Sequence, residues 1–439
     1  SMSFSCKEMG TQILCVFVVD EAGNTDYCTT YVLIQDNNTP KICVEATVAS
    51  FGGRVNTENA EPVQHVQVEL KSATAASTMM TGNDGKYHFS GLDVSKSYLV
   101  VPDRNVDWMN GVSTLDLVVI QQHIMGVKAL SSKFKLLAAD VNNSKDIDVV
   151  DLVELRKLIL GIYEKLPNNK SWRFADKSVT GGLSPYIIKE VLEMKGLPLP
   201  SKNYDFVGIK IGDVNESVTA HQLMGMEIRT NAEDIIFSTE ELKVEAGKSY
   251  DIPIRMSKAG YLIGYQFTLQ LDPKILEYTG YKKGKLILDP SHFGYTHLQE
   301  GLISTSWNST LATLLNKDEV LFFISIKAKT SGMLSRHFSI NSNIIRSEAY
   351  SNEVDSRPLK LEFKGSMAAD QRLVLYQNSP NPFNKQTVIA FELPQSGEAS
   401  IIITDIAGKT LKVIQGQFGK GYNQIELFKQ DFQGTGVRY

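Results

Sequence analysis

One short stretch of this 439-residue chain places oxygen-bearing side chains at the alternating spacing of a cation-binding loop. Between residues 140 and 151 they stand at positions one, three, five, nine and twelve, while position seven can offer its backbone carbonyl. With position seven included, the residues are Asp140, Asn142, Ser144, Asp146, Asp148 and Asp151. Calcium takes six to eight oxygen ligands, and such a curled loop directs alternate residues at one centre. Because four carboxylates would otherwise repel one another, the spacing predicts a calcium site.

The same loop also has a simpler interpretation, because aspartate and asparagine are common in polar loops that precede a capped helix. The apolar Ile147 at position eight can anchor the loop to the core. Asp151 falls on the first turn of the following helix, where its charge suits the positive end of the helix dipole. Lys145 occupies position six, where glycine normally relieves a sharp turn, so we expect backbone strain at this residue.

The segment before this loop repeats the pattern in a degenerate form. Residues 112–127 and 147–162 align without gaps, with Asp116 opposite Asp151. Both segments show the apolar spacing of an amphipathic helix and reach a glycine at its end, as helices commonly do. The repeat therefore predicts two loop–helix units in tandem.

A second calcium ion is predicted before the first of these helices, with the register of its loop left open. At the same offset, the residues at positions one, three, nine and twelve are Asn105, Asp107, Ser113 and Asp116. Met109 falls at position five, where its thioether cannot ligate calcium. In the alternative register the loop starts at Asp103, with an insertion around Trp108 and Met109 and with help from Asn110.

These two units, each ending in D-L-x-x-[IL]-x-x-x-[IL]-[ML]-G, resemble a type I dockerin across residues 103–176. The resemblance implies a calcium-folded module that docks onto a cohesin domain through its helices. By that resemblance the partner-binding positions are Thr114, Leu115, Gln121, Gln122, Val149, Val150, Arg156 and Lys157. The pairs differ between the two repeats, which argues against a symmetric dual binding mode.

Residues 205–365 are rich in short strands with alternating apolar side chains, which is typical of a β-sandwich. The run G-Y-Q-F-T-L-Q-L-D-P from Gly264 to Pro273 resembles a cohesin domain, which implies a nine-stranded jelly roll. A different secreted sandwich with the same alternation is the alternative. If both resemblances hold, the two modules could pair within one chain or head to tail between chains, and head-to-tail pairing would permit filaments. The plainer alternative is that each serves as a spacer.

The regions on either side are also predicted to be β-sandwiches. Residues 42–102 carry T-x-x-D-G-x-Y-x-F from Thr81 to Phe89, which resembles the carboxypeptidase-regulatory-like, or prealbumin-like, fold. Residues 1–41 read as a hairpin, and VVDEAGNTDYCTTYVLIQD resembles the closing strands of a hyalin-repeat, immunoglobulin-like domain whose earlier strands would precede residue 1. Residues 177–204 are expected to be a linker with one short helix.

The C-terminal residues 366–439 carry the signal for cellular location. The motif Y-Q-N-S-P-N-P-F-N from Tyr376 to Asn384 resembles the type A C-terminal sorting domain of the type IX secretion system, truncated here at its end. That resemblance implies a Bacteroidota protein that the type IX machinery exports to the outer-membrane surface or beyond.

The four cysteines all lie in the first tenth of the chain. Cys6, Cys15, Cys28 and Cys43 are an even number in a β-rich segment, which favours disulfides and an oxidising compartment. Folding about the turn at residues 21–24 should bring Cys15 and Cys28 roughly opposite each other. Free buried thiols or a metal site are the alternatives.

Composition and motifs exclude several classes of function. The net charge of −4 offers no basic field for nucleic acid, and no apolar run is long enough to span a membrane. The chain contains no H-E-x-x-H, G-x-S-x-G, P-loop or dinucleotide-binding motif. We therefore expect a mainly β, multidomain, non-catalytic protein of adhesion or assembly with one small helical calcium-loop module. The alternative is the accessory C-terminal part of a larger secreted hydrolase.

Overall fold

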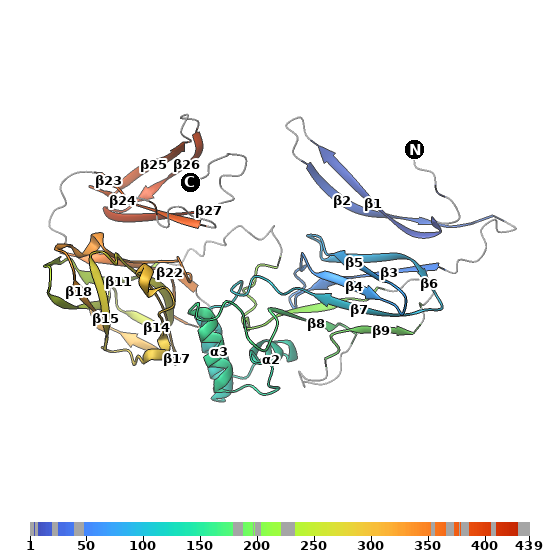
Figure 1. Cartoon of the computed structure of the whole chain (residues 1–439), viewed down its shortest axis with the longest axis horizontal. Coiled ribbons are helices and arrows are strands. Elements are labelled where there is room, and N and C mark those ends of the chain that lie inside the picture. The colour runs from blue at the N-terminus through green and yellow to red at the C-terminus, as the bar shows by residue number, and fades with distance from the viewer. Residues whose placement is uncertain are drawn as a thin grey trace. The chain divides into compact units, whose positions relative to one another are not determined.

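A computed structural model describes residues 4, 8–19, 25–38, 48–178, 188–195, 197, 203–220, 233–352, 356–365, 373–376, 378, 386–404 and 410–428. The chain divides into two compact units. The first comprises Ser1–Leu158 and Tyr163–Arg229, and the second comprises Ile159–Ile162 and Thr230–Tyr439. Figure 1 shows that strands dominate both units and that the helices are confined to the middle of the chain.

The elements of the first unit are β1 (Gly10–Val19), β2 (Thr25–Ile34), β3 (Val48–Asn56), β4 (Gln67–Lys71), β5 (Ala76–Met80), β6 (Lys86–Asp93), β7 (Ser97–Asp103), α1 (Thr114–Ile124), α2 (Lys133–Ala139), α3 (Val149–Ile159), β8 (Trp172–Asp176), β9 (Leu192–Lys195) and β10 (Phe206–Lys210). The last residue of α3 is counted with the second unit.

The elements of the second unit are β11 (Ile235–Glu240), β12 (Lys243–Val244), β13 (Ser249–Met256), β14 (Gly260–Leu271), β15 (Leu276–Lys283), η4 (Pro290–His292), β16 (Phe293–Gly294), η5 (Leu298–Glu300), β17 (Leu302–Leu315), β18 (Val320–Ala328), β19 (Gly332–Met333), η6 (Leu334–Arg336), β20 (Phe338–Asn341), β21 (Glu348–Tyr350), β22 (Ser356–Lys364), β23 (Val374–Leu375), β24 (Gln386–Leu393), β25 (Gly397–Thr404), β26 (Thr410–Phe418) and β27 (Gly421–Phe428).

The predicted N-terminal hairpin forms, but the pairing expected of its cysteines is wrong. In the β1–β2 ladder Cys15 lies opposite Thr29, and Cys28 lies opposite Val16. This one-residue offset sends the two thiols to opposite faces of the hairpin, because successive side chains alternate across a strand. Both are exposed, free cysteines. Cys6 and Cys43 lie outside the described residues.

The first sandwich draws its strands from two separated stretches of the chain. Its sheets have the orders β6-β3-β10-β8 and β5-β4-β7-β9, so the last three strands follow the helical segment. In Figure 1 the early strands are blue and the late ones green, and both belong to this one sandwich. The helical module is therefore an insertion between β7 and β8.

This arrangement corrects three predicted boundaries. Strand β8 was assigned to the helical module, β9 falls where a linker helix was expected, and β10 was assigned to the next domain. Sequence distance hid these pairings: Phe206 on β10 aligns with Val55 on β3 and with Asp176 on β8. Phe206 and Trp172 are both buried in the shared core.

The turn that marks this sandwich owes its sequence to local hydrogen bonds. The buried Thr81 hydroxyl donates to the Val63 carbonyl (2.8 Å) and accepts from the Val66 N–H (2.9 Å). Gly85 has φ +67°, a left-handed conformation that glycine adopts without strain. A Cβ at Gly85 would also lie 2.5 Å from the Val55 carbonyl oxygen. Both the backbone conformation and this close contact therefore favour glycine.

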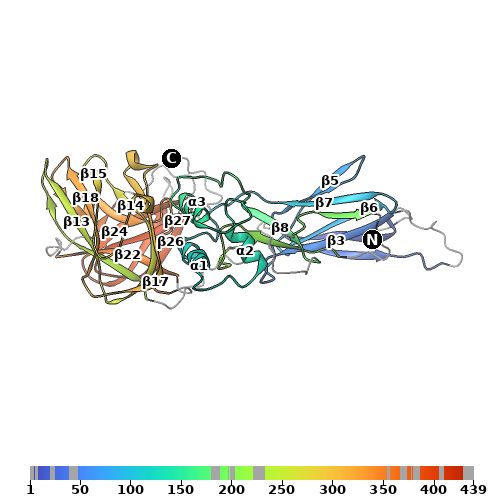
Figure 2. The same cartoon turned by 90° about the horizontal axis from the view of Figure 1, so that it is seen from below.

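The two predicted helices of the repeat form as α1 and α3, with a third, unpredicted helix, α2, between them. Figure 2 shows the three helices, in teal, as one group. Gly126 and Gly161 follow α1 and α3 with φ +69° and +68°, the left-handed conformation expected of helix-terminating glycines. Ser113 caps α1 in a reciprocal capping box with Asp116.

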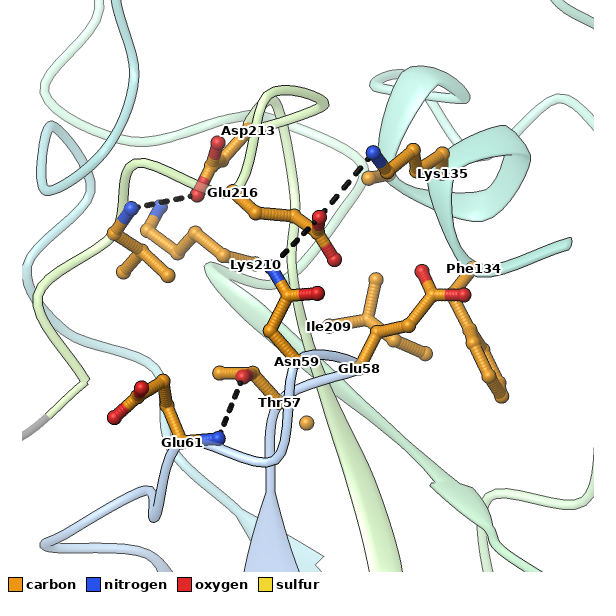
Figure 3. A pocket seen from close by; sticks show the side chains of 13 residues that line it. Thr57, Glu58, Asn59, Glu61, Phe134, Lys135, Ile209, Lys210, Asp213 and Glu216 are labelled. Carbon is orange, nitrogen blue, oxygen red and sulfur yellow. Dashed lines mark hydrogen bonds and ion pairs between the residues drawn. The ribbon is translucent and has the colours of Figure 1, made fainter. Parts of the chain in front are cut away.

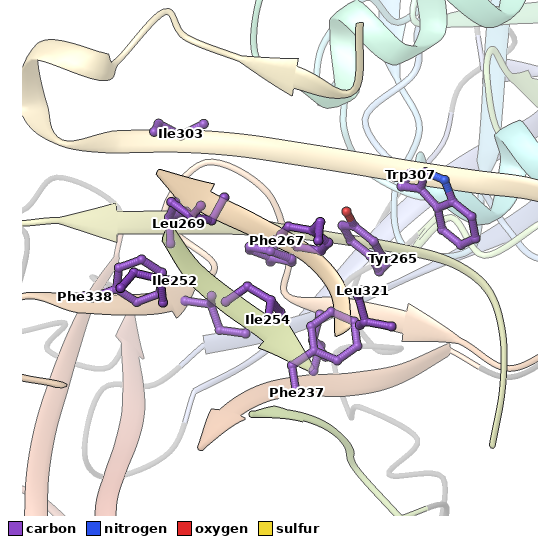
Figure 4. Packing of buried hydrophobic residues seen from close by; sticks show 14 of the residues in the cluster. Phe237, Ile252, Ile254, Tyr265, Phe267, Leu269, Ile303, Trp307, Leu321 and Phe338 are labelled. Atoms are coloured by element: carbon purple, nitrogen blue, oxygen red, sulfur yellow. The ribbon is translucent and has the colours of Figure 1, made fainter. Parts of the chain in front are cut away.

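The jelly roll predicted within the second unit is confirmed. Its strand path is β15-β18-β13-β11-β22-β21-β14-β17-β16, with β20 also paired to β14, and it folds over a single core. Tyr265 lies at the centre of that core and stacks on Phe267, Trp307 and Phe322 with ring centroids 5.4–5.8 Å apart. Figure 4 shows Tyr265, Phe267 and Trp307 among the apolar side chains of this core.

The C-terminal region contains the strands β24, β25, β26 and β27. β24 pairs with β23 and β27, and β25 pairs with β26. Most of the motif from Tyr376 to Asn384 lies outside the described residues. Across the described residues, none of the helices has the length and apolar character needed to cross a membrane.

The shared sandwich predicts a specific pattern of destabilisation. We expect Phe206→Ala to destabilise the first unit by about 3–5 kcal/mol, because it leaves a cavity in a closed core. Phe237→Ala, at an equally buried position of the jelly roll, should act on the second unit instead. Hydrogen exchange followed by mass spectrometry would resolve the two. Loss of protection in the jelly roll of the Phe206→Ala protein would contradict the assignment of β10.

Candidate functional site

Residues 140–151 wind into a closed turn through hydrogen bonds from backbone N–H groups to their own side chains. The Ser144 N–H donates to Oδ1 of Asp140 and to Oδ1 of Asn142, both at 2.8 Å. The Lys145 N–H donates to Oδ2 of Asp140 (3.0 Å). Asp151 closes the turn, because its two carboxylate oxygens accept from the N–H groups of Asn142 (3.0 Å) and Asp148 (2.9 Å).

The two carboxylates at the ends of this turn are fully buried. Asp140 and Asp151 are both 0% exposed. Burial raises the pKa of Asp140, and burial together with the nearby charges of Asp140 and Asp148 raises the pKa of Asp151. Ionised carboxylates in such a position need compensation by a positive charge.

The turn of residues 140–151 offers a hard cation several kinds of oxygen ligand, and not carboxylates alone. Within the described residues, no three His, Cys, Asp or Glu side chains are placed to hold a metal ion together. The turn instead combines two buried carboxylates with the Asn142 amide, the Ser144 hydroxyl and the Asp146 carbonyl, which already accepts from Ser144 Oγ at 3.2 Å. Calcium accepts such combinations of carboxylate, amide and carbonyl oxygens.

Two residues outside the loop hold its shape, and neither was predicted. The Asn169 side chain donates to the carbonyls of Asp140 (2.9 Å) and Val141 (3.1 Å). Arg173 donates to the Asn143 side chain (3.1 Å). Sequence alone gives no signal for either contact, because both residues lie far along the chain in irregular or strand segments. The strain expected at Lys145 is present, since its φ is +71°.

The residues predicted to open the first loop have other partners. Asn105 accepts from the Ser171 N–H (2.8 Å), and Asp107 forms an ion pair with Arg104 (3.1 Å). The alternative starting residue, Asp103, forms an ion pair with Lys170 (2.6 Å). Among the contacts of the described residues, none joins these three residues to Ser113 or Asp116.

Asp116 is instead met by a segment that follows β10. Its Oδ1 accepts from the N–H groups of Val214 (2.9 Å) and Asn215 (3.3 Å), 98 and 99 residues away in the chain. Its Oδ2 accepts from the Ser113 N–H (2.9 Å). A signal for this segment was available in the sequence, because D-V-N-x-S occurs both at 140–144 and at 213–217.

The partner-binding positions predicted for the two repeats differ in exposure. Thr114 and Leu115 on α1 are buried, whereas Val149 and Val150 on α3 are 63% and 46% exposed. Val153, one turn further along α3, is also exposed. Arg156 and Lys157 are half-buried, and the Lys157 ammonium lies over the Tyr163 ring. Of the predicted pairs, the one at the start of α3 is therefore open to a partner.

A small cavity of about 50 Å³ lies beside the segment after β10. Figure 3 shows Glu216 at its wall, bound by Lys135 (3.2 Å) and by the Asn59 amide (2.9 Å). Small-molecule sites are usually of about 300–1,000 Å³. This cavity has room for water only and is no substrate pocket.

Comparison with known proteins assigns one part of the chain. Residues 237–358 match the family model described as "Cohesin domain", and these are the residues of the jelly roll. The comparison with curated proteins returned no match. The match indicates a module of protein–protein assembly without catalytic activity of its own, of a kind typically found outside the cell or on its surface.

Several solved cohesins are similar to a part of this chain. One is the sixth cohesin of scaffoldin B from Acetivibrio cellulolyticus, solved with a dockerin, at 18% identity over 30% of this chain and 95% of that chain, with a TM-score of 0.24. A type I cohesin–dockerin complex from Clostridium thermocellum matches at 17% identity over 29% and 94%, with a TM-score of 0.24. A non-cellulosomal cohesin from Archaeoglobus fulgidus matches at 12% identity over 29% and 86%, with a TM-score of 0.20.

The strained backbone of the loop predicts a stabilising substitution. Lys145→Gly should raise the free energy of unfolding of the first unit by about 1 kcal/mol, because a left-handed residue with a Cβ is strained and glycine is not. Lys165→Gly, in an exposed bend without positive φ, should lower it slightly. Thermal unfolding of both variants checks this expectation, and equal destabilisation by the two substitutions would contradict it.

Proposed function

We propose that this chain is a calcium-binding, non-catalytic assembly protein that acts outside the cell or on its surface. The observation that carries the proposal is the cohesin match over residues 237–358 in the same chain as a helical module with a calcium-type loop. Cohesins similar to this chain were solved in complex with dockerins. The module with α1 and α3 has the dockerin-like sequence pattern of such a partner.

Calcium would bind in the turn of residues 140–151. Asp140, Asn142, Ser144, the Asp146 carbonyl, Asp148 and Asp151 would provide its ligands. The ion would supply the positive charge that two fully buried carboxylates call for. The chain's own contribution is a turn already wound by backbone hydrogen bonds and braced by Asn169.

The partner surface of the helical module would lie at the start of α3. Val149, Val150 and Val153 form an exposed apolar strip there, and exposed apolar strips commonly mark interaction sites. Pairing of this strip with a cohesin-like domain, within the chain or between chains, would make the protein a link in a larger assembly. The buried Thr114 and Leu115 support one docking mode rather than two equivalent ones.

Export would proceed through the type IX secretion system, with the C-terminal β unit as the sorting signal. The support is the motif from Tyr376 to Asn384 in the sequence, and the short strands β24–β27 agree with a small sandwich there. The protein would then reside at the outer-membrane surface or in the medium, where adhesion is a natural use for linked sandwich modules.

Removal of calcium should loosen the first unit. At a calcium concentration one hundred times the dissociation constant, each bound ion adds about 2.7 kcal/mol to stability. Differential scanning calorimetry of the full chain in calcium and in chelator measures this. The first unit should melt earlier in chelator while the jelly roll stays unchanged, and an unchanged profile would contradict the calcium assignment.

Pairing of the modules can be tested on the full chain by chemical cross-linking and mass spectrometry. Calcium should produce cross-links between residues 112–153, all in the first unit, and residues 234–364. A mixture of ¹⁴N- and ¹⁵N-labelled chains separates links within a molecule from links between molecules. Val150→Glu should remove these links. Val127→Glu, at a similarly exposed valine beyond α1, is the control and should retain them. Absence of such links in calcium would refute pairing.

A further inference from the structure

We propose that the chain holds a second calcium site assembled from two remote segments, one at residues 213–217 and the other at residues 111–116. The first segment would supply Asp213, Asn215 and Ser217, and the second would supply the Gly111 carbonyl, Ser113 and Asp116. The proposal extends the calcium binding proposed for residues 140–151, and it stands on contacts of its own.

The first half of the split turn repeats the start of the continuous one. The Ser217 N–H donates to Oδ1 of Asp213 (3.1 Å) and to Oδ1 of Asn215 (3.0 Å). The Val218 N–H donates to Oδ2 of Asp213 (2.9 Å). These are the bonds that Ser144 and Lys145 make to Asp140 and Asn142, which places the Asp213, Asn215 and Ser217 side chains at positions one, three and five.

The second half repeats the end of the continuous turn. Asp116 accepts from Asn215, the residue at position three, and from Ser113, the residue at position nine. Asp151 accepts from Asn142 and Asp148 in the same two relations. Asp116 therefore stands at position twelve of a loop whose first five positions come from after β10.

The point at which the chain is interrupted is also matched. The Ser217 hydroxyl donates to the Gly111 carbonyl (3.0 Å), as the Ser144 hydroxyl donates to the Asp146 carbonyl at position seven. Val112 then falls at position eight and is buried, in the place of Ile147. At position four, Glu216 has φ +62° and Asn143 has φ +58°.

Burial of the carboxylates is an independent observation that points to a cation. Asp116 is 0% exposed and Asp213 is 5% exposed. No ion pair of the described chain involves either of them. The positive charge of the buried Lys210 acts on the Asp213 carboxylate, but the Lys210 ammonium donates its hydrogen bond to the Trp108 carbonyl (2.8 Å). One positive charge does not compensate the negative charges of two buried carboxylates.

A simple helix cap does not account for this arrangement. The capping box between Ser113 and Asp116 uses Oδ2 of Asp116 and explains why an acidic residue stands on the first turn of α1. It does not require Oδ1 to meet Val214 and Asn215, or a second buried carboxylate at Asp213. The Asn110 side chain further fastens the two segments, because it donates to the Thr219 carbonyl (2.9 Å) and accepts from the Thr219 N–H (3.0 Å).

The test is isothermal titration of calcium into the full chain, with stoichiometry checked by native mass spectrometry. The unsubstituted protein should bind two ions. Asp213→Asn should lose one of them, and Asp151→Asn should lose the other. Asp107→Asn removes a carboxylate that pairs with Arg104 and serves as the matched control, so it should keep both ions.

Because Asp213 is buried, its substitution could impair folding. Asn215 is half-exposed, so a substitution there should leave the fold intact. Asn215→Ala should weaken one of the two sites by at least about tenfold, a loss typical even of outer residues at metal sites. Two ions bound with full affinity by both Asp213→Asn and Asn215→Ala, or an ion lost from Asp107→Asn, would overturn the split site. Loss of an ion from Asp213→Asn with no change in Asp151→Asn would instead refute calcium at 140–151 and leave the split site standing.

Discussion

A buried carboxylate on the first turn of a helix is the feature on which the middle of this chain depends. Asp151 accepts hydrogen bonds from backbone N–H groups of the turn directly before its helix, and Asp116 accepts them from a turn that is distant in the sequence. Each thereby fixes the start of its helix and the shape of a turn at once. The cost is a negative charge removed from water, which a protein tolerates only with compensation. A bound cation would supply that compensation, and folding would then be linked to calcium.

The contacts of the buried Asp116 carboxylate also explain why the helical module is inserted into the first sandwich and is not a separate domain. The chain leaves the first sandwich at the end of β7, builds three helices, and returns as β8. β10 then runs into the centre of a sheet beside β3, and the segment that meets Asp116 follows it directly. The sandwich positions one half of the split turn and the module positions the other. Stability of the sandwich and order at the start of α1 are thus coupled.

Much of this could be predicted from local sequence patterns. The strands of the jelly roll, the helices α1 and α3, and the turn of Thr81–Gly85 follow from periodicity and from residues that only certain backbone conformations accept. The pattern of oxygen-bearing side chains at residues 140–151 could be recognised because these residues are contiguous in the sequence. In the proposed split turn, positions one to five would lie after β10, whereas a contiguous loop before α1 predicts Asn105 and Asp107 as ligands. The pairing of β10 with β3, and the one-residue offset between Cys15 and Cys28, depend on strand register across the chain, which local patterns do not determine.

We propose that two turns of the same geometry, one continuous and one split, each enclose a calcium ion. A crystal structure of the full chain grown in calcium, with anomalous difference maps, tests this most directly. The account predicts one peak within residues 140–151 and a second peak between the carboxylates of Asp116 and Asp213, each about 2.3–2.6 Å from its oxygen ligands. A second peak beside Asn105 and Asp107, or a single peak with the Asp116–Asp213 turn closed and empty, would contradict it.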